Sequence, residues 1–571
     1  MPRWRPARVA PWLALALATA LAAAPASAPA VAAHPERRVV LLGLRQRGEL
    51  PRFARRVSNP ASSQYRRFAD LAQFRRRFSA RPADRRRVLR FLRHRRGVKS
   101  VELSSTRTIA LGVMTPAAAR RAFCAAGPAP PTHGLCIPRR LRPAVRQISA
   151  GETYELGGPG AADRRAASRR TSAASQGARQ GCRAALDAGG FTPNQLATAY
   201  GVDGLRARGL EGEGVRVVTL SAETPRDIGL GVWARCFDLR KPRVRPVSMP
   251  GGNDSTAMPS TEEALDIESL ASLAPRLERI TPIFVPLDQS QSFGNSFPLF
   301  MFGALDPSRQ GGRLPDVLSI SDAVCERQFT HDQLRLGQRM LREAAALGIT
   351  VLAASGDAGF LGCATGKPGA NFPNSSRFVA GVGGTELTLD AQNRIAGQAV
   401  WSTFAAAGNQ GAGSGGGPSS VWGRPSFQRA PGLGPALEPH RRTRLGPDVA
   451  AMASFTPGIS VYDAGQGGWG ADGGTSAGTP LTAAIVALVR EQERASGRPA
   501  LGSLPPLLYS LARGPDYHSI FDDVTVGTSS QRPNSAAGRT PAGGAAQPGY
   551  DLATGLGSLD ATAFAAAVAA P

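Results

Sequence analysis

The sequence predicts an α/β protein whose parallel sheet is covered by helices on both faces, preceded by a small α+β unit. Two observations predict this. Apolar runs of strand length alternate with helical segments from residue 183 onward, which is typical of parallel sheets buried on both faces. The charge is distributed unevenly and changes near residue 180. Residues 1–180 contain 36 Lys and Arg against 8 Asp and Glu, so the positive net charge of the chain, +26, comes from this part.

The first 33 residues have the pattern of a signal peptide. Arg3, Arg5 and Arg8 precede a short apolar core and small residues, with a predicted cleavage near Ala32 or Ala33. A membrane anchor is the alternative, but the apolar core is shorter than the roughly 20 residues that a bilayer requires. We therefore expect a secreted, extracellular protein with no membrane partner.

Residues 34–150 alternate strand and helix patterns in a way that predicts a compact α+β unit. Residues 151–182 lack hydrophobic periodicity and contain two dibasic pairs, so this stretch is predicted to be a linker with a processing site. Within residues 34–150 the strands are expected at 38–45, 98–104 and 108–114, and the helices at 49–58, 70–79 and 82–96.

Residues 183–571 are predicted to form the main domain. Functional residues of such sheets lie just after the carboxyl ends of the strands, which directs attention to Ser321, Asp322, Gly356 and Asp357. The predicted strands are 214–222, 279–287, 316–323 and 349–357, and the predicted helices include 262–274 and 329–348.

Six cysteines in an exported chain permit disulfides, with 15 possible pairings. We favour Cys124 with Cys136, which closes a short Pro-rich loop, and Cys325 with Cys363, each of which follows a predicted strand. No cysteine cluster has zinc spacing. The basic N-terminal part also permits a nucleic-acid partner, but it contains no nucleic-acid motif, and we expect none.

The stretch GGTSAGTP, residues 473–480, places Ser476 before a long apolar helical run. A nucleophilic serine needs a base, and the segment 258–275 offers one in Glu262 and Asp266, four apart on one predicted helix face. Two close carboxylates share a proton and can act without histidine. The alternatives are a solvated acidic helix face, a helix N-cap for Ser476 and a turn aspartate for Asp357. Ser260 and Glu263 are predicted to form a capping box.

Taken together, these stretches resemble the sedolisins, or serine-carboxyl peptidases, with a kumamolisin-type activation domain. The resemblance covers nearly everything after the signal peptide. It implies a subtilisin-like catalytic domain over 183–571 and a ferredoxin-like prodomain over 34–150. It is carried by SNPASSQYRRFADLAQFRRRF, FTPNQLATAYGV, EEALDIE, AASGD, NFPNSSRFVAGVGGTEL, GSGGGPSSVWGRPSFQ, PDVAA and GGTSAGTP.

The resemblance implies that Ser476 is the nucleophile, Glu262 its general base, Asp266 the carboxylate behind Glu262, and Asp357 the oxyanion stabiliser. It implies an endopeptidase made as a zymogen, with tripeptidyl-peptidase activity as an open possibility. Peptide or protein substrates and the prodomain as intramolecular inhibitor are the expected partners of a monomer. A carboxylate base works in acid, where imidazole is protonated, and a protonated Asp357 can donate a hydrogen bond. The basic prodomain is expected to be held by an acidic catalytic part at neutral pH and released in acid.

FDDVTVG and QPGYDLATGLGS resemble the calcium loop of the family and imply one Ca²⁺ ion. Asp523 and Asp551 would give carboxylates, and Val524, Gln547 and Gly549 main-chain carbonyls. Gln547 stands where the family has glycine. Two ordinary turn aspartates are the alternative.

Asp322-Ala323 replaces the Trp-Gly typical of the family, so an acidic subsite that favours basic side chains is a hypothesis. Two other functions remain open. Gly474 to Gly478 satisfies G-x-S-x-G of esterases, although a predicted glycine-rich loop, 465–474, precedes Ser476 and only His518 follows it. The chain could also be an exported binding protein that has lost catalysis.

Overall fold

The computed structural model describes eleven segments of the chain. All of them belong to the unit Arg37–Pro571. The predicted signal peptide and most of the predicted linker lie outside the described residues. The segments are 37–123, 136–150, 178–221, 226–250, 261–285, 293–361, 368–404, 411–429, 432–434, 440–530 and 544–570.

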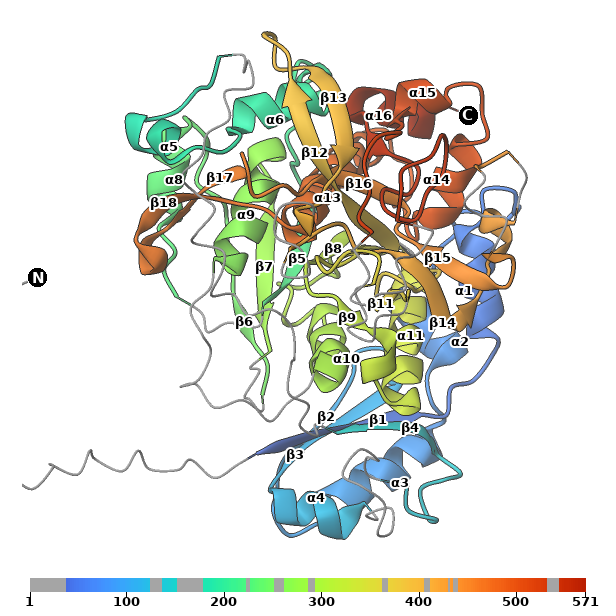
Figure 1. Cartoon of the computed structure of the whole chain (residues 1–571). Coiled ribbons are helices and arrows are strands. Elements are labelled where there is room, and N and C mark those ends of the chain that lie inside the picture. Colours follow the sequence, from blue (N-terminus) through green and yellow to red (C-terminus); the bar gives the residue numbers. More distant parts are fainter. Residues whose placement is uncertain are drawn as a thin grey trace, which may run out of the picture. The chain divides into compact units, whose positions relative to one another are not determined.

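Residues 37–150, called the N-terminal domain here, form a four-stranded antiparallel sheet with helices (Figure 1), which agrees with the predicted α+β character but adds a strand that was not predicted. The strand order is β2-β3-β1-β4, and the fourth strand, β4, extends the domain to Ala150. Its elements are β1 Arg38–Leu44, α1 Leu50–Ser58, α2 Leu71–Phe78, α3 Pro82–Arg93, β2 Val98–Leu103, β3 Ile109–Met114, α4 Pro116–Ala122 and β4 Val145–Ala150.

Both faces of this small sheet are buried, which explains the unbroken apolar run of β1. Val40 and Leu42 pack with α3 and α4 in one apolar cluster. Val39 and Leu41 point to the other face and join a second cluster with residues of the following domain. Successive strand residues alternate between faces, so β1 belongs to two cores at once.

The C-terminal domain, residues 178–570, is built on a large and mostly parallel sheet with the order β19-β20-β16-β12-β10-β8-β5-β7-β6. The pairs from β7 through β5, β8, β10 and β12 to β16 are parallel, whereas β13 pairs antiparallel with β12. The main strands are β5 Arg216–Ser221, β6 Val247–Ser248, β7 Arg279–Phe284, β8 Val317–Ile320, β10 Thr350–Ala354, β12 Ala380–Leu389, β13 Ile395–Val400, β16 Val449–Met452, β19 Phe521–Asp522 and β20 Ser558–Leu559.

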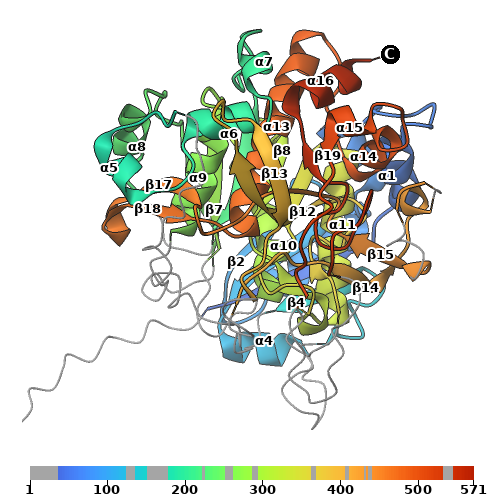
Figure 2. The same cartoon turned by 45° about the horizontal axis from the view of Figure 1, so that its top comes forward.

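Helices cover both faces of the large sheet, so the predicted fold class is confirmed (Figures 1 and 2). Neighbouring strand residues again divide between two cores: Val217 packs on the face of α9 and α13, and Val218 on the face of α10 and α11. The helices are α5 Arg183–Ala188, α6 Pro193–Ala199, α7 Asp203–Arg206, α8 Leu230–Cys236, α9 Glu262–Leu273, α10 Phe293–Ala304, α11 His331–Ala346, α13 Thr475–Ala495, α14 Pro505–Leu511, α15 Tyr517–Ile520 and α16 Ala561–Ala569.

Three short antiparallel pairs complete the sheet structure. The prediction that residues 465–474 form a loop is wrong in part, because Gly468–Asp472 forms the strand β18 and pairs with β17. The short strands are β9 Val324–Cys325 with β11 Asn371–Phe372, β14 Gly417–Gly423 with β15 Thr443–Gly446, and β17 Ile459–Asp463 with β18.

A disulfide joins Cys182 to Cys236, the pair left over by the two pairings favoured from the sequence. Cys136 and Cys325 are also disulfide-bonded. The partners favoured for them, Cys124 and Cys363, lie outside the described residues. No helix in the described segments is long and apolar enough to cross a membrane.

Side chains of the N-terminal domain contact α11 and the end of α13. Glu343 of α11 is fully buried and accepts hydrogen bonds from Gln46 Nε2 at 2.8 Å and Thr108 Oγ1 at 3.0 Å. Burial raises its pKa, although Arg339 opposes that effect. The ion pairs between the two domains are not all of the expected kind, in which a basic N-terminal residue meets an acidic C-terminal one. Arg66 pairs with Glu493 in this way, but Glu102 of the N-terminal domain pairs with Arg309 of the C-terminal domain.

Candidate active site

Ser476 lies in the first turn of α13, beyond the carboxyl ends of β8 and β10. The helix begins at Thr475 after Gly474, whose φ of 82° is readily adopted only by glycine. Ser476 is therefore inside the helix, and the N-cap alternative is wrong. It is half-buried, whereas its neighbours Thr475 and Ala477 are buried.

Asp357 follows β10 and is tied to the residue before Ser476. Its Oδ1 accepts hydrogen bonds from Thr475 N at 2.9 Å and Thr475 Oγ1 at 2.8 Å. A proton on this carboxyl group would therefore sit on Oδ2. That oxygen faces Gly474, where a Cβ would lie only 2.6 Å from it. Glycine at 474 thus permits the approach of the carboxyl group to the start of α13.

Asp266 is buried at 2% exposure and reaches Ser476 through Ser321, the first residue after β8. Ser321 Oγ lies 2.5 Å from Asp266 Oδ1 and 3.4 Å from the carbonyl oxygen of Ser476. In the other direction, Ser476 Oγ lies 3.5 Å from the carbonyl oxygen of Ser321. The strand-end rule therefore located Ser321, which contacts Ser476, and Asp357, which contacts the neighbouring residue Thr475.

Glu262 is the first residue of α9 and is half-exposed. The preceding residue, Thr261, donates its hydroxyl hydrogen to Asp472, which also accepts from Gly473 N at 2.8 Å. This contact joins the start of α9 to the segment that leads into Ser476. The helix places Asp266 one turn behind Glu262, on the same face. Although the residue as a whole is half-exposed, the Oε1 atom of Glu262 is buried.

The alternative of a solvated acidic face on α9 is wrong. Asp266 and Glu268 are 2% and 0% exposed, and Glu268 accepts a hydrogen bond from Tyr462 N at 2.8 Å. Burial raises the pKa of Glu268 well above its ordinary value. Thr261 occupies the N-cap without a side-chain cap, and Ser260 of the predicted capping box lies outside the described residues.

Two residues that contact the site were missed from the sequence, Thr475 and Asp472. The signal for Thr475 was its position directly before the serine in GGTSAGTP, and that for Asp472 was its position before the glycine pair. Asp322 follows Ser321 and is half-buried, and its role in a subsite stays a prediction.

Contacts link the proposed calcium ligands in two pairs, Asp523 with Gly549 and Asp551 with the backbone of Gln547. Asp523 Oδ2 accepts from Gly549 N at 2.8 Å, and Asp551 is fully buried. Burial raises the pKa of Asp551 to about 6 although Thr554 and Ala553 donate to it. A fully buried carboxylate such as that of Asp551 fits a hard cation that would compensate its charge. The described residues contain no group of three or more His, Cys, Asp and Glu arranged for a metal, so carbonyl oxygens would have to complete this site.

The esterase elbow is not supported by the geometry. A strand does precede Ser476, but β18 belongs to the two-stranded β17–β18 sheet and not to the large sheet. His518 lies in α15, where its ring packs against Tyr517 at 4.8 Å between centroids. A nucleophile elbow requires a central strand and a histidine that reaches the serine.

Comparison with known proteins supports the class that fold and site suggest, a subtilisin-like α/β domain behind an activation domain. The family "Pro-kumamolisin, activation domain" matches residues 29–125. Kumamolisin from Bacillus sp. is 33% identical over 375 residues, covering 64% of this chain and 62% of that protein. Tripeptidyl-peptidase sed4 from Aspergillus fumigatus is 29% identical over 414 residues, covering 65% of each. The match thus spans less than two thirds of the length of either relative.

Human tripeptidyl-peptidase 1 is 31% identical over 274 residues, covering 43% of this chain and 42% of that protein. Among solved structures, Pseudomonas sedolisin complexed with two molecules of pseudo-iodotyrostatin has a TM-score of 0.53 at 23% identity. It covers 67% of this chain and 98% of that one, and this likeness shows the fold. The chain is therefore similar to kumamolisin and to the tripeptidyl-peptidases over part of their length, contains a match to the pro-kumamolisin activation domain, and shares the fold of sedolisin.

Proposed function

We propose that the chain is a secreted serine-carboxyl endopeptidase, made as a zymogen and active in acid. The observation that carries the proposal is the convergence on α13: Asp357 is bonded to Thr475, and Asp266 is linked through Ser321 to Ser476. The order of these residues along the chain and the similarity to kumamolisin and the tripeptidyl-peptidases support the same assignment.

In this mechanism Ser476 Oγ attacks the carbonyl carbon of the substrate while Glu262 takes the hydroxyl proton. Asp266, held by Ser321, orients Glu262 and supports its charge. Asp357 donates the proton on Oδ2 to the oxyanion that develops on the substrate. Glu262 then returns its proton to the leaving amine, and water hydrolyses the acyl-enzyme by the same steps.

Acid is required for two reasons. A glutamate with an ordinary pKa near ~4.3 is a partly ionised base there, and Asp357 must keep its proton to donate it. The N-terminal domain would be the inhibitory prodomain, released by cleavage within 151–182. Peptides and proteins would be the substrates, and one Ca²⁺ ion held by Asp523, Asp551 and nearby carbonyls would fix the C-terminal loops. We expect secretion through the N-terminal segment and a monomeric enzyme.

The test is hydrolysis of a denatured protein after acid incubation of the full chain. Wild type should process itself and digest the substrate, whereas Ser476→Ala and Glu262→Gln should lose both activities with unchanged circular dichroism. Glu263→Gln is the matched control, because it removes the adjacent carboxylate of α9 and should stay active. Full activity of Ser476→Ala would refute the nucleophile. A well-folded but inactive wild type would favour the binding-protein alternative.

A further inference from the structure

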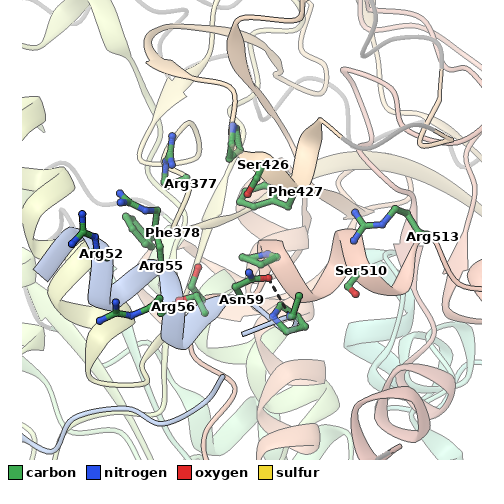
Figure 3. Close-up of a pocket in the computed structure, with 16 residues that line it drawn as sticks. Arg52, Arg55, Arg56, Asn59, Arg377, Phe378, Ser426, Phe427, Ser510 and Arg513 are labelled. Atoms are coloured by element: carbon green, nitrogen blue, oxygen red, sulfur yellow. Dashed lines mark hydrogen bonds between the residues drawn. The ribbon is translucent and has the colours of Figure 1, made fainter. Parts of the chain in front are cut away.

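A cavity of about 620 Å³ lies where α1 of the N-terminal domain meets the C-terminal domain (Figure 3). Its lining includes Arg52, Arg55 and Arg56 from α1. Arg377, which follows β11, and Arg513, just after α14, line it from the C-terminal domain. Figure 3 shows these side chains arranged around one space, together with the hydroxyl groups of serines.

The positive charge of this cavity is not neutralised by the protein. No aspartate or glutamate is among its lining residues. Within the described segments, no ion pair involves any of the five arginines, and Arg377 bonds instead to the neutral carbonyl of Gly423 at 3.3 Å. Burial, followed by the charge of Arg55, lowers the pKa of Arg377. Four of these arginines are exposed and Arg377 is half-buried, so five positive charges line one solvent-accessible cavity that has no acidic lining residue, which favours an anion.

The lining also indicates which anion fits. Guanidinium groups present forked donors that match the oxygens of phosphate in pairs, and Ser426 and Ser510 can add neutral hydroxyl donors. The volume lies within the range of small-molecule sites, so several linked phosphate groups can enter. A phosphate group keeps about one negative charge below its second ionisation near pH 6. Such a ligand would stay charged in acid, where carboxylates become neutral.

We propose that the cavity between α1 and the C-terminal domain binds a short oligophosphate, which then clamps the two domains together. Arginines from both domains contact the same anion, so binding exchanges their mutual repulsion for attraction. The bound anion opposes separation of the domains. This regulatory consequence rests on the proposed function, whereas the binding site itself does not.

Binding is tested on the full chain with Ser476→Ala, which cannot process itself. Inorganic triphosphate is titrated calorimetrically at acidic and neutral pH in chloride of matched ionic strength. We expect one saturable site, and Arg55→Gln with Arg377→Gln should weaken it about 10- to 100-fold, because charge-assisted hydrogen bonds are lost on both sides of the cavity. The matched control is Arg87→Gln with Arg90→Gln, which removes two exposed charges from α3 and should leave the affinity unchanged.

Equal weakening in both double variants would show attraction to net charge alone and would overturn the proposal, as would the absence of saturation. A second measurement follows processing of the wild-type chain in acid. Triphosphate should slow processing of wild type but not of the Arg55→Gln, Arg377→Gln chain. If wild type never processes itself, the proposed function fails while the calorimetric result still decides the site.

Discussion

Arg66 is the residue through which the N-terminal domain is most directly tied to α13, and its removal should loosen that domain selectively. Arg66 Nη1 lies 2.7 Å from Glu493 Oε2, and Nε donates to the carbonyl of Ala500 at 2.9 Å. The Glu493 side chain is fully buried and that of Arg66 is 11% exposed. Nearby, the Phe68 ring packs so closely on Gly502 that a Cβ there would lie 2.4 Å from it.

The cost of Arg66→Ala follows from the burial of its partner. Breaking a buried ion pair costs about 3–5 kcal/mol when the remaining charge is left without a partner. Glu493 keeps its contact with Arg498, so we expect the lower value of about 2 kcal/mol typical of a lost charged hydrogen bond. This corresponds to an increase of about 30-fold in the equilibrium constant for opening of the N-terminal domain.

Native-state hydrogen exchange of the Ser476→Ala chain measures this opening. The reporter is the amide of Ala69, which donates to the carbonyl of Ala346 at 3.0 Å across the contact. Arg67→Ala is the matched control, because it removes an exposed neighbouring arginine. Equal exchange rates in the two variants would refute the reasoning, since the effect would then follow net charge and not the buried pair.

Three further predictions concern titration, the active site and the metal. Burial raises the pKa of Glu343, so the stability that this group contributes is complete below the ordinary pKa of glutamate and is lost as pH rises through its folded-state pKa. In Glu343→Gln the free energy of unfolding should no longer decline over this pH range. Urea midpoints of the variant that change with pH in parallel with wild type would contradict this. Thr475→Val removes a hydroxyl bond to Asp357 and should lower kcat/KM about tenfold at unchanged fold, whereas Thr479→Val, whose hydroxyl bonds only within α13, should retain activity. Calcium chelation should lower the melting temperature of wild type reversibly, and Asp523→Asn should abolish the response to added calcium; an identical response in the variant would exclude this residue as a ligand.

The regular elements could be predicted from the sequence because the chain is locally consistent. Apolar runs such as 216–221 and 350–354 are short, bounded by turns and buried on both faces, so their periodicity and length agree with the fold. The segment 468–472 was missed because two of its five residues are glycines, glycine also flanks it on both sides, and no β-branched residue occurs in it; its strand is stabilised by pairing with β17. The strand β18 thus forms because of a tertiary contact with β17, which the local sequence pattern does not reveal.

The candidate site could likewise be predicted from the sequence only in part. Helix periodicity alone places Glu262 and Asp266 on one face, and the strand-end rule alone brings Ser321 and Asp357 to one edge of the sheet. Neither rule predicts that Asp266 is buried behind Ser321, because that depends on how α9 packs against α13 across β8 and β5. The burial of Asp266 excludes a solvated acidic helix face, and the proton-sharing pair proposed above would depend on it, because desolvation makes double ionisation costly. The chemistry proposed for Ser476 therefore depends on a packing relation between two helices that are more than 200 residues apart in the chain.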